Sequence, residues 1–436
     1  MPLGAGPVDT ADRIKTVDMI RGFALLGILL MNIPGFGINW DFWYNVATGP
    51  HSGKDYNTNF IISVFFEGTM RGLFSMLFGA GMILFTMNKK DVPGGPTVAD
   101  YYYRRLLWLV LFGIINAFVF LWPGDILYFY GLCGMLLFAF RKSKPRWLLI
   151  IGLACISITM LKAQLSWNEL RDKRKAYTEA VSAEKAKKKL TDEQQAAITA
   201  WTQVEKNEKP DTTFTNRNLR NMRSSYATIF SYFIPQSAGV EVNYMYNGVW
   251  DMLCMMFIGM ALFGWGFFSN RLSTSTYFIW LLVGYGIGIP IGWVLVKEGW
   301  LDSTGHTGAY VDAWRMPHWV FAEFRRLPLT IGHASLLMLI YRSRLVPWLM
   351  KALANVGQMA FSNYLMQSII CTLFFYGYGL GNYNKLRFYQ LYYVVAAVWI
   401  FQIIFSVIWL RYFRFGPFEW LWRSLTYWKK QPMKLK

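Results

Sequence analysis

Residues 17–33 read VDMIRGFALLGILLMNI, an apolar segment with Asp18 and Arg21 near its start and Asn32 near its end. Similar apolar runs recur through the 436-residue chain, and a run of about twenty residues spans a bilayer as a helix. Only 16% of the residues are charged, whereas roughly a quarter are charged in a typical soluble protein. The sequence therefore predicts an all-α polytopic membrane protein.

The apolar runs predict about ten transmembrane helices in two groups of five. A hydrophilic insert, residues 166–240, separates an N-terminal bundle (1–165) from a C-terminal bundle (241–436). The predicted spans cover approximately residues 18–37, 59–87, 105–122, 125–140, 147–165, 245–268, 276–296, 320–341, 354–378 and 389–411.

Basic residues predict the orientation of these spans. With both termini in the cytoplasm, the cytoplasmic segments, including residues 141–146 and 411–436, hold far more Lys and Arg side chains than the short outer loops do, as the positive-inside rule requires. The insert then lies outside the cytoplasm. Much of the net charge of +19 is thus an orientation signal, so we expect membrane lipids as partners and no nucleic acid.

The insert has the composition of exposed helices, because it is rich in Ala, Glu and Lys. Thr191 and Gln194 form a capping-box pattern that predicts the start of a second helix after Leu190. We therefore expect a charged helical hairpin. It is either a solvated spacer or an element that acts as a lid or docks a partner.

Charged groups inside the spans are candidates for function, because an unpaired charge in hydrocarbon costs several kcal/mol. Glu67 and Arg71 are four residues apart in the second span. On one helix they would share a face and neutralise one another. Structural pairing and substrate binding explain this pair equally well. The FGAG motif at 78–81 predicts close helix packing.

Further polar residues have two interpretations each. Asp125, in the turn WPGDIL, either caps the fourth helix or belongs to a site, whereas Asp251 has no local partner in the sixth span. Arg325 and Arg326 suit a phosphate or carboxylate ligand, or they extend to the membrane interface. His333 is either a hydrogen-bonded core histidine or a catalyst.

Two other sets of residues have structural interpretations. Asn363 and Gln367 read as interhelical hydrogen-bonding groups. The four cysteines all lie in apolar runs, where buried thiols mostly serve packing, so we expect neither a disulfide nor a metal site.

Several segments resemble the YeiB family: VDMIRGFALLGILLMNIPGFG, FSMLFGAG, GDILYFYGLCGMLL and the closing GPFEWLWRSLTYW. The similarity covers nearly the whole chain outside the insert, and the C-terminal region of this family is known as domain of unknown function 418. The resemblance implies a multi-pass protein of the bacterial cytoplasmic (inner) membrane. It supplies an architecture, because the family has no settled activity.

The first span is also similar, more distantly, to the transmembrane acyltransferase superfamily, in which an Asp-x-x-Arg-Gly pattern opens the helix. Here the pattern is Asp18, Arg21 and Gly22. Eleven residues after the arginine, one branch of the superfamily has a histidine, and this chain has Asn32. Heparan-glucosaminide acetyltransferase also has asparagine there, with its working histidine in the next loop. The resemblance therefore implies a catalytic role for His51.

Residues around His51 agree with that role, because Asp55 is near enough in sequence to orient or balance an imidazole. Eleven residues on a helix extend about 16 Å, so Arg21 and Asn32 would lie near opposite faces of the membrane. Arg21 would hold the phosphates of a cytoplasmic acyl donor, and transfer would take place near the outer face.

Two main functions remain open, and the sequence does not decide whether the protein is an enzyme. In the first, an integral-membrane acyltransferase uses acyl-CoA as donor. Arg21 binds the donor, Asn32 stabilises the carbonyl oxygen, and His51 or else His333 is the general base. In the second, a transporter or channel moves a small polar or anionic solute past a path lined by Glu67, Arg71, Asp251 and Arg325. A scaffold or sensor that acts through the insert is a third hypothesis, and a homodimer is compatible with each.

The predicted topology can be tested with reporter fusions at Lys206 and at the C-terminus. Because basic residues concentrate on one side, we expect the two reporters on opposite sides of the membrane. Reporters on the same side would contradict the topology.

Overall fold

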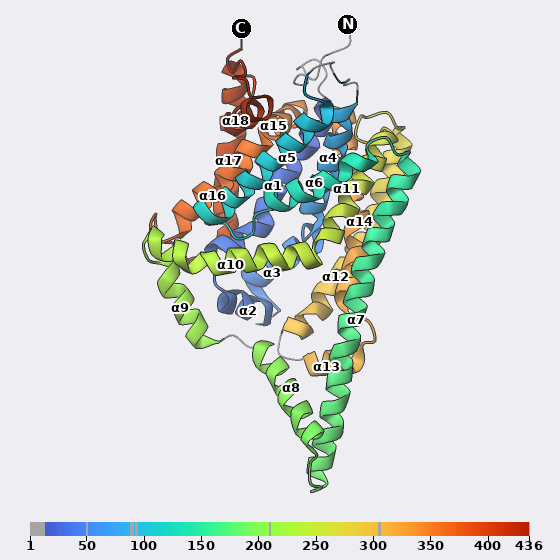
Figure 1. The fold of residues 1–436 in the computed structure, drawn as a ribbon, viewed down its shortest axis with the longest axis vertical. Helices are drawn as coiled ribbons and strands as arrows, with labels where there is room; N and C mark the ends of the chain where they lie inside the picture. Colours follow the sequence, from blue (N-terminus) through green and yellow to red (C-terminus); the bar gives the residue numbers. More distant parts are fainter. Residues whose placement is uncertain are drawn as a thin grey trace.

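The computed structural model describes residues 14–48, 51–87, 91, 95–208, 211–303 and 307–435. This part of the chain is helical and contains no β-strand beyond one isolated bridge between Phe413 and Lys434. The helices pack together at several inclinations, and a helical hairpin extends from one end of the molecule (Figure 1). The structure confirms the predicted all-α polytopic membrane fold.

The helices fall into three groups along the chain. The first group comprises α1 (Lys15–Gly37), α2 (Trp40–Thr48), α3 (Gly53–Phe65), α4 (Thr69–Thr86), α5 (Val98–Ile114), the π-helical turn η2 (Ile115–Val119), α6 (Leu127–Leu137) and the 3₁₀ turn η3 (Phe138–Phe140). The second comprises α7 (Pro145–Lys185), α8 (Asp192–Glu208), α9 (Thr212–Met222) and α10 (Tyr226–Asn247). The third comprises α11 (Val249–Gly264), α12 (Thr274–Ser303), α13 (Thr307–Ala313), α14 (His318–Ser343), α15 (Pro347–Gln358), α16 (Ala360–Phe375), α17 (Phe388–Tyr412) and α18 (Pro417–Tyr427).

Among the described residues, six helices are long and apolar enough to cross a membrane. They cover Lys15–Gly37, Gly53–Thr86, Val98–Val119, Pro145–Lys185, Thr274–Lys297 and Phe388–Tyr412. Three shorter apolar helices, Leu127–Phe140, Val249–Gly264 and Ala360–Phe375, and the 26-residue α14 occupy the other predicted ranges. Each of the ten predicted spans therefore overlaps at least one helix, although some of these helices are short.

The fifth span and the first arm of the insert form one helix. α7 has 41 residues, about 60 Å at 1.5 Å per residue, whereas the hydrocarbon core is about 30 Å thick. Its distal half and α8 form the predicted hairpin (Figure 1). The capping box is confirmed, because the Thr191 backbone N–H donates to Gln194 at 3.1 Å and the Gln194 N–H donates to the Thr191 hydroxyl at 3.2 Å.

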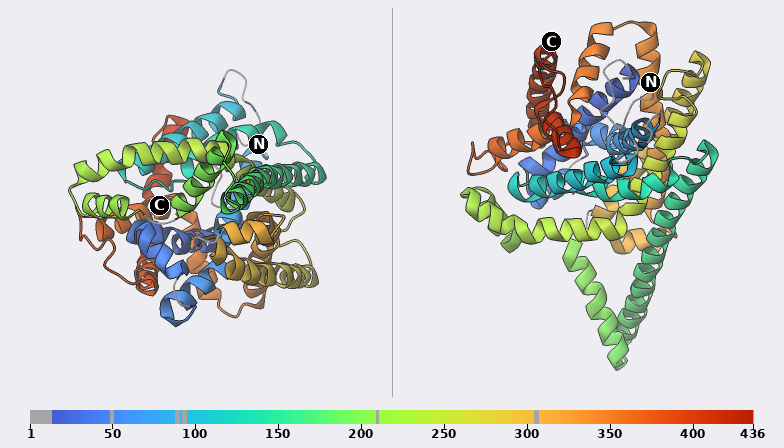
Figure 2. Two further views of the ribbon diagram at one scale, coloured as in Figure 1. Left: turned by 90° about the horizontal axis from the view of Figure 1, so that it is seen from below. Right: turned by 45° about the horizontal axis from the view of Figure 1, so that its top comes forward.

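The two ends of the bundle differ, and we name them by their residues. The terminal face carries α18 and the first turn of α1, and the hairpin face is the end from which α7 and α8 extend (Figure 1). α10 lies across the axis of α7 in the views of Figures 1 and 2. α18 and the hairpin therefore lie at opposite ends of the molecule (Figure 1).

The hairpin packs against α13, the short helix between α12 and α14. Trp167, Trp201 and Tyr310 form a buried cluster there. The Arg174 guanidinium binds the Asp312 carboxylate at 2.8 Å, and this carboxylate raises the pKa of Arg174 above its ordinary value. The hairpin is thus attached to the connection that leads into α14.

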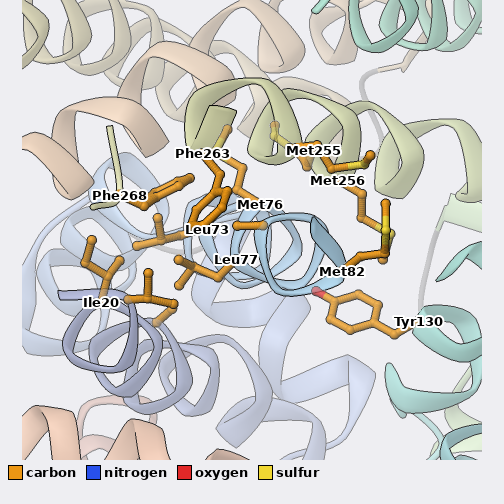
Figure 3. Packing of buried hydrophobic residues seen from close by; sticks show 14 of the residues in the cluster. Ile20, Leu73, Met76, Leu77, Met82, Tyr130, Met255, Met256, Phe263 and Phe268 are labelled. Atoms are coloured by element: carbon orange, nitrogen blue, oxygen red, sulfur yellow. The ribbon is translucent and has the colours of Figure 1, made fainter. Parts of the chain in front are cut away.

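The main core surrounds α4, which lies between α1 and α11 (Figure 3). Met76 of α4 and Met256 of α11 are fully buried, and glycines bring these two helices together. A β-carbon on Gly79 would lie 2.1 Å from the Met256 carbonyl oxygen, and one on Gly259 would lie 2.0 Å from the Met76 carbonyl oxygen. This reciprocal contact confirms the packing role predicted for the FGAG motif.

Two predicted spans are interrupted, contrary to the prediction of continuous helices. The second span breaks between α3 and α4, where Gly68 has φ +71°, a left-handed conformation that glycine adopts without strain. The ninth span is α16, and a break at Met359 separates it from α15. Each interruption leaves backbone groups to be satisfied from outside the helix.

Other polar interpretations are confirmed by hydrogen bonds. Asn363 donates to the Ser406 hydroxyl at 2.9 Å, and Gln367 donates to Gln402 at 3.1 Å, so both join α16 to α17.

The four cysteines, Cys133, Cys155, Cys254 and Cys371, are all buried and free.

The glycine crossing of α4 and α11 yields a test of stability. Gly79→Ala should lower the free energy of unfolding by about 1–3 kcal/mol, because its methyl group would meet backbone that cannot rotate away. Gly81→Ala is the matched control, since no atom lies within 4 Å of its added β-carbon. Thermal unfolding of the purified protein in detergent compares them, and equal midpoints would contradict the packing role.

Candidate functional site

The end of α3 is held by an arginine from α14. The Arg325 guanidinium donates to the carbonyl oxygens of Ser63 at 2.5 Å, Val64 at 2.9 Å and Glu67 at 3.2 Å. The last carbonyls of a helix have no intrahelical partner, and inside a membrane water does not replace one. Arg325, only 5% exposed, therefore stabilises the break in the second span.

His333 completes the same support. One ring nitrogen, Nε2, lies 2.8 Å from the Phe65 carbonyl oxygen, and Nδ1 lies 2.9 Å from the Tyr285 hydroxyl. A carbonyl only accepts, so Nε2 carries a proton, and in the neutral ring Nδ1 accepts from Tyr285. Both nitrogens are engaged, which favours the core-histidine interpretation of His333 over a catalytic one.

An ion-pair network lies beside the break. Asp251 of α11 binds Arg71 of α4 at 2.8 Å and also pairs with Arg326 of α14, which binds Glu323 at 2.6 Å. The interpretation of Arg325 and Arg326 as interfacial residues is therefore wrong, because both are buried and bonded within the bundle. Asp251, which has no local partner in the sequence, is the centre of this network.

The predicted helical pairing of Glu67 with Arg71 is not formed as expected, because the break at Gly68 removes the continuous helix on which it depended. Arg71 instead contacts Asp251. Glu67 still lies within electrostatic range of Arg71 and Arg325. The two residues thus belong to one site, but they approach it from opposite sides of the break.

These groups line a cavity of about 470 Å³ near the hairpin face, which we call the charged cavity. Its polar lining includes Asn59, Glu67, Arg71, Glu323, Arg325 and Arg326. Glu67 is exposed to this space, and Arg71 keeps 28% of its side chain exposed. Trp43 and Tyr392 contribute aromatic lining. The volume falls in the range of small-molecule sites.

A second cavity, of about 230 Å³, lies near the terminal face, and we call it the amphipathic cavity. Its polar groups are Asp18, Arg21, Arg105, Glu419 and Arg423, and most other lining residues are apolar, such as Phe78, Leu106 and Phe361. α1 lines both cavities, with Val17, Asp18 and Arg21 at one end and Leu30, Met31 and Pro34 at the other.

The amphipathic cavity borders the second break. Glu419 of α18 accepts hydrogen bonds from the backbone N–H groups of Phe361 at 2.7 Å and Ser362 at 3.0 Å, at the start of α16. Burial raises the pKa of Glu419, and the hydrogen bonds from Ser362 and Phe361 oppose that rise. A carboxylate at a helix N-terminus is also stabilised by the helix dipole.

Arginines at this cavity have internal partners that position them. Arg21 binds Asp18 at 2.8 Å. The Arg105 guanidinium lies 3.9 Å from the centre of the Trp422 ring, and the Trp422 indole N–H donates to the Arg105 carbonyl oxygen at 2.8 Å. Three guanidinium groups against two carboxylates give this cavity a positive balance.

The structure does not bring Asn32 and His51 into either cavity. Asn32 is partly buried on α1 and is absent from both linings. His51 is exposed and stacks on Tyr56, with ring centres 5.1 Å apart. Asp55 interacts with the start of α17 and not with His51. Its carboxylate accepts from the Tyr389 backbone N–H at 3.0 Å and pairs with Arg387 at 3.8 Å.

Asp125 has the capping role that was one of its two interpretations. It accepts from the Tyr128 backbone N–H at 2.9 Å at the start of α6, and from the Asn116 amide at 2.7 Å. It lies outside both cavity linings. Asp125 thus joins the π-helical turn η2, through Asn116, to the start of α6.

Sequence reasoning missed several residues that line these cavities, among them Asn59, Arg105, Glu419 and Arg423. Arg105 opens the third predicted span, and Glu419 and Arg423 lie in the closing segment outside every span. Glu419 follows the GP pair at 416–417 in the first turn of α18, but its partners are separated from it by 57 and 58 residues.

The fold and the site define a class: a multi-pass helical membrane protein with a charged and an amphipathic cavity at opposite ends of one helix. The chain is 30% identical to the uncharacterized protein YxaH of Bacillus subtilis (strain 168), over 99% of this chain and 98% of that protein. It is 31% identical to the uncharacterized protein YeiB of Escherichia coli (strain K12), over 95% and 96%.

This chain belongs to the family of YxaH and YeiB. Residues 262–429 match the family model described as protein of unknown function (DUF418), so the predicted family membership is confirmed. An uncharacterized 39.9 kDa protein of Bacillus acidopullulyticus is 25% identical over 99% of this chain and 98% of its own length. No solved structure matches the chain.

The network at Asp251 predicts a large cost for one buried substitution. Asp251→Asn would leave Arg71 and Arg326 close together without their shared carboxylate, so the free energy of unfolding should fall by about 3–5 kcal/mol. Asp312→Asn is the matched control, because its side chain is 51% exposed, and a surface pair contributes about 0–1 kcal/mol. Denaturant unfolding in mixed micelles measures both, and similar losses would contradict the assigned role of Asp251.

Proposed function

We propose that the protein is an integral-membrane acyltransferase that uses acyl-CoA as donor, with the terminal face in the cytoplasm. The observation that carries this proposal is the amphipathic cavity, where Arg21, Arg105 and Arg423 adjoin an apolar lining. A donor with phosphates at one end and an acyl chain at the other matches that combination. The resemblance of the Asp18–Gly22 pattern to the acyltransferase superfamily supports the same function.

The charged cavity is the proposed acceptor site, because it lies at the other end of α1 and offers polar groups to a second substrate. We assign the general base to Glu67 in place of His51, since Glu67 faces the cavity and His51 does not line it. Glu67 takes a proton from the acceptor nitrogen or oxygen, which attacks the thioester carbonyl carbon. The new C–N or C–O bond replaces the C–S bond, and the leaving thiolate takes up a proton.

The donor must pass between the two cavities for this reaction. Met70 of α4 packs against Gly27, which lies in the part of α1 between the residues that line the two cavities. A β-carbon on Gly27 would lie 2.3 Å from the Met70 sulfur. A methionine side chain is flexible and repacks readily. We therefore propose that movement of Met70 admits the thioester to the charged cavity.

Transport of a small polar or anionic solute is the second candidate. The break between α3 and α4 favours it, because discontinuous helices line the substrate sites of many transporters. Glu67 and Arg71 flank this break and both line the charged cavity. A transporter moves its solute without acyl-CoA, which separates the two functions experimentally.

Purified protein in liposomes provides the test. Arg21→Ala should weaken acyl-CoA binding about 10- to 100-fold, the loss expected for a hydrogen bond between charged groups, whereas Glu67→Gln should lower turnover more than donor binding. Arg146→Ala is the control, because this exposed arginine lines neither cavity. Absence of acyl-CoA binding would sink the acyltransferase proposal, and solute uptake without acyl-CoA would establish transport.

A further inference from the structure

We propose that the charged cavity binds a zwitterionic ligand, a small group that carries one ammonium and one phosphate or carboxylate. This inference rests on the proposed function only in naming that ligand the acyl acceptor. The recognition itself is argued from the charges of the cavity.

The first argument is the charge balance of the site. The cavity and its ion-pair network contain three guanidinium groups and three carboxylates in the described residues: Arg71, Arg325, Arg326, Glu67, Asp251 and Glu323. A ligand with a net charge would leave one charge uncompensated in a low-dielectric region, at a cost of several kcal/mol. A ligand that carries both signs preserves the balance.

The second argument is that both signs face the cavity. Glu67 is exposed to it. Among the described residues, no Lys or Arg forms an ion pair with the Glu67 carboxylate within 4.0 Å. Arg71 is also partly exposed, and it shares the Asp251 carboxylate with Arg326. An ammonium group therefore fits beside Glu67, and an anionic group fits beside Arg71.

The third argument concerns the surroundings of these two side chains. Arg71 lies in the first turn of α4, where the positive end of the helix dipole adds to the attraction of an anion. The Asn59 amide nitrogen is buried at the cavity and has no hydrogen-bond partner among the residues that the structure describes. Trp43 and Tyr392 line the same space, and aromatic faces attract ammonium groups.

The geometry disfavours two other ligand classes. No group of three or more His, Cys, Asp or Glu side chains in the described part of the chain is arranged to hold a metal ion, so a cation held by carboxylates is a poor match. A neutral polyol would bring no positive charge to the Glu67 carboxylate, which faces the cavity. The ammonium of a zwitterion, in contrast, places its nitrogen beside the proposed general base.

Phosphoethanolamine is the probe for this chemistry, because it has one ammonium and one phosphate. Isothermal titration of the full-length protein in detergent should show binding of phosphoethanolamine, with ethanolamine and inorganic phosphate at least tenfold weaker. Glu67→Gln should weaken phosphoethanolamine binding at least tenfold. Glu169→Gln is the matched control, since Glu169 is exposed on α7 and lies outside the cavity, and it should leave binding unchanged.

A second arm distinguishes a soluble ligand from a lipid headgroup. Nanodiscs containing phosphatidylethanolamine should block phosphoethanolamine binding if the headgroup enters the cavity, and discs of phosphatidylglycerol should not. Blocking identifies the lipid as the source, and absence of blocking identifies the soluble molecule. Either result supports a zwitterion site.

Three results would overturn the inference: equal affinity for phosphoethanolamine and its single-charge fragments, tighter binding of glucose, or full binding by folded Glu67→Gln protein. Elution of each variant as a monodisperse peak establishes that it is folded. Acyl-CoA binding is measured separately, and Glu67→Gln should retain it. The zwitterion site and the donor site are therefore tested independently of one another.

Discussion

The need to satisfy backbone groups where a membrane helix is interrupted determines where this protein places its buried charges. At the end of α3, Arg325 and His333 bind the exposed carbonyls. At the start of α16, Glu419 accepts the free N–H groups. Hydrogen-bond donors meet the carbonyl end of α3 and an acceptor meets the N–H end of α16, and in both places the interruption adjoins a cavity. The residues that stabilise the interrupted helices thus lie next to the residues of the candidate functional site.

The fold was largely predictable because its signals are local. Span length, the capping box at Thr191 and the glycines at 78–81 all act within a few residues or between flat helix faces. The candidate site was less predictable, since its contacts join distant positions. Glu67 and Arg71 were grouped by helical spacing, and the glycine between them ended the helix. Neither interpretation of Arg325, as a ligand-binding or as an interfacial residue, included its helix-end role, because nothing near it in sequence reveals the carbonyls it binds.

The pattern at Asp18, Arg21 and Asn32 shows the same limit. Resemblance placed these residues and His51 in one site, whereas the structure places Arg21 in the amphipathic cavity and leaves His51 in an exposed position. Helical spacing correctly separates the two ends of α1, but it does not specify which face of the helix meets a cavity. Packing against α4, α15 and α17 decides that face, and these helices come from both halves of the chain.

The partners of α3 lie far along the chain, which has a consequence for biogenesis. Arg325 and His333 are 258 to 268 residues from the carbonyls they bind, so a ribosome releases α3 and α4 long before α14 exists. Until α14 inserts, the interrupted segment carries unsatisfied carbonyls that lipid does not accommodate. The N-terminal half therefore needs a hydrated or chaperoned environment during synthesis. Truncated chains that end before α14 are expected substrates for membrane quality control.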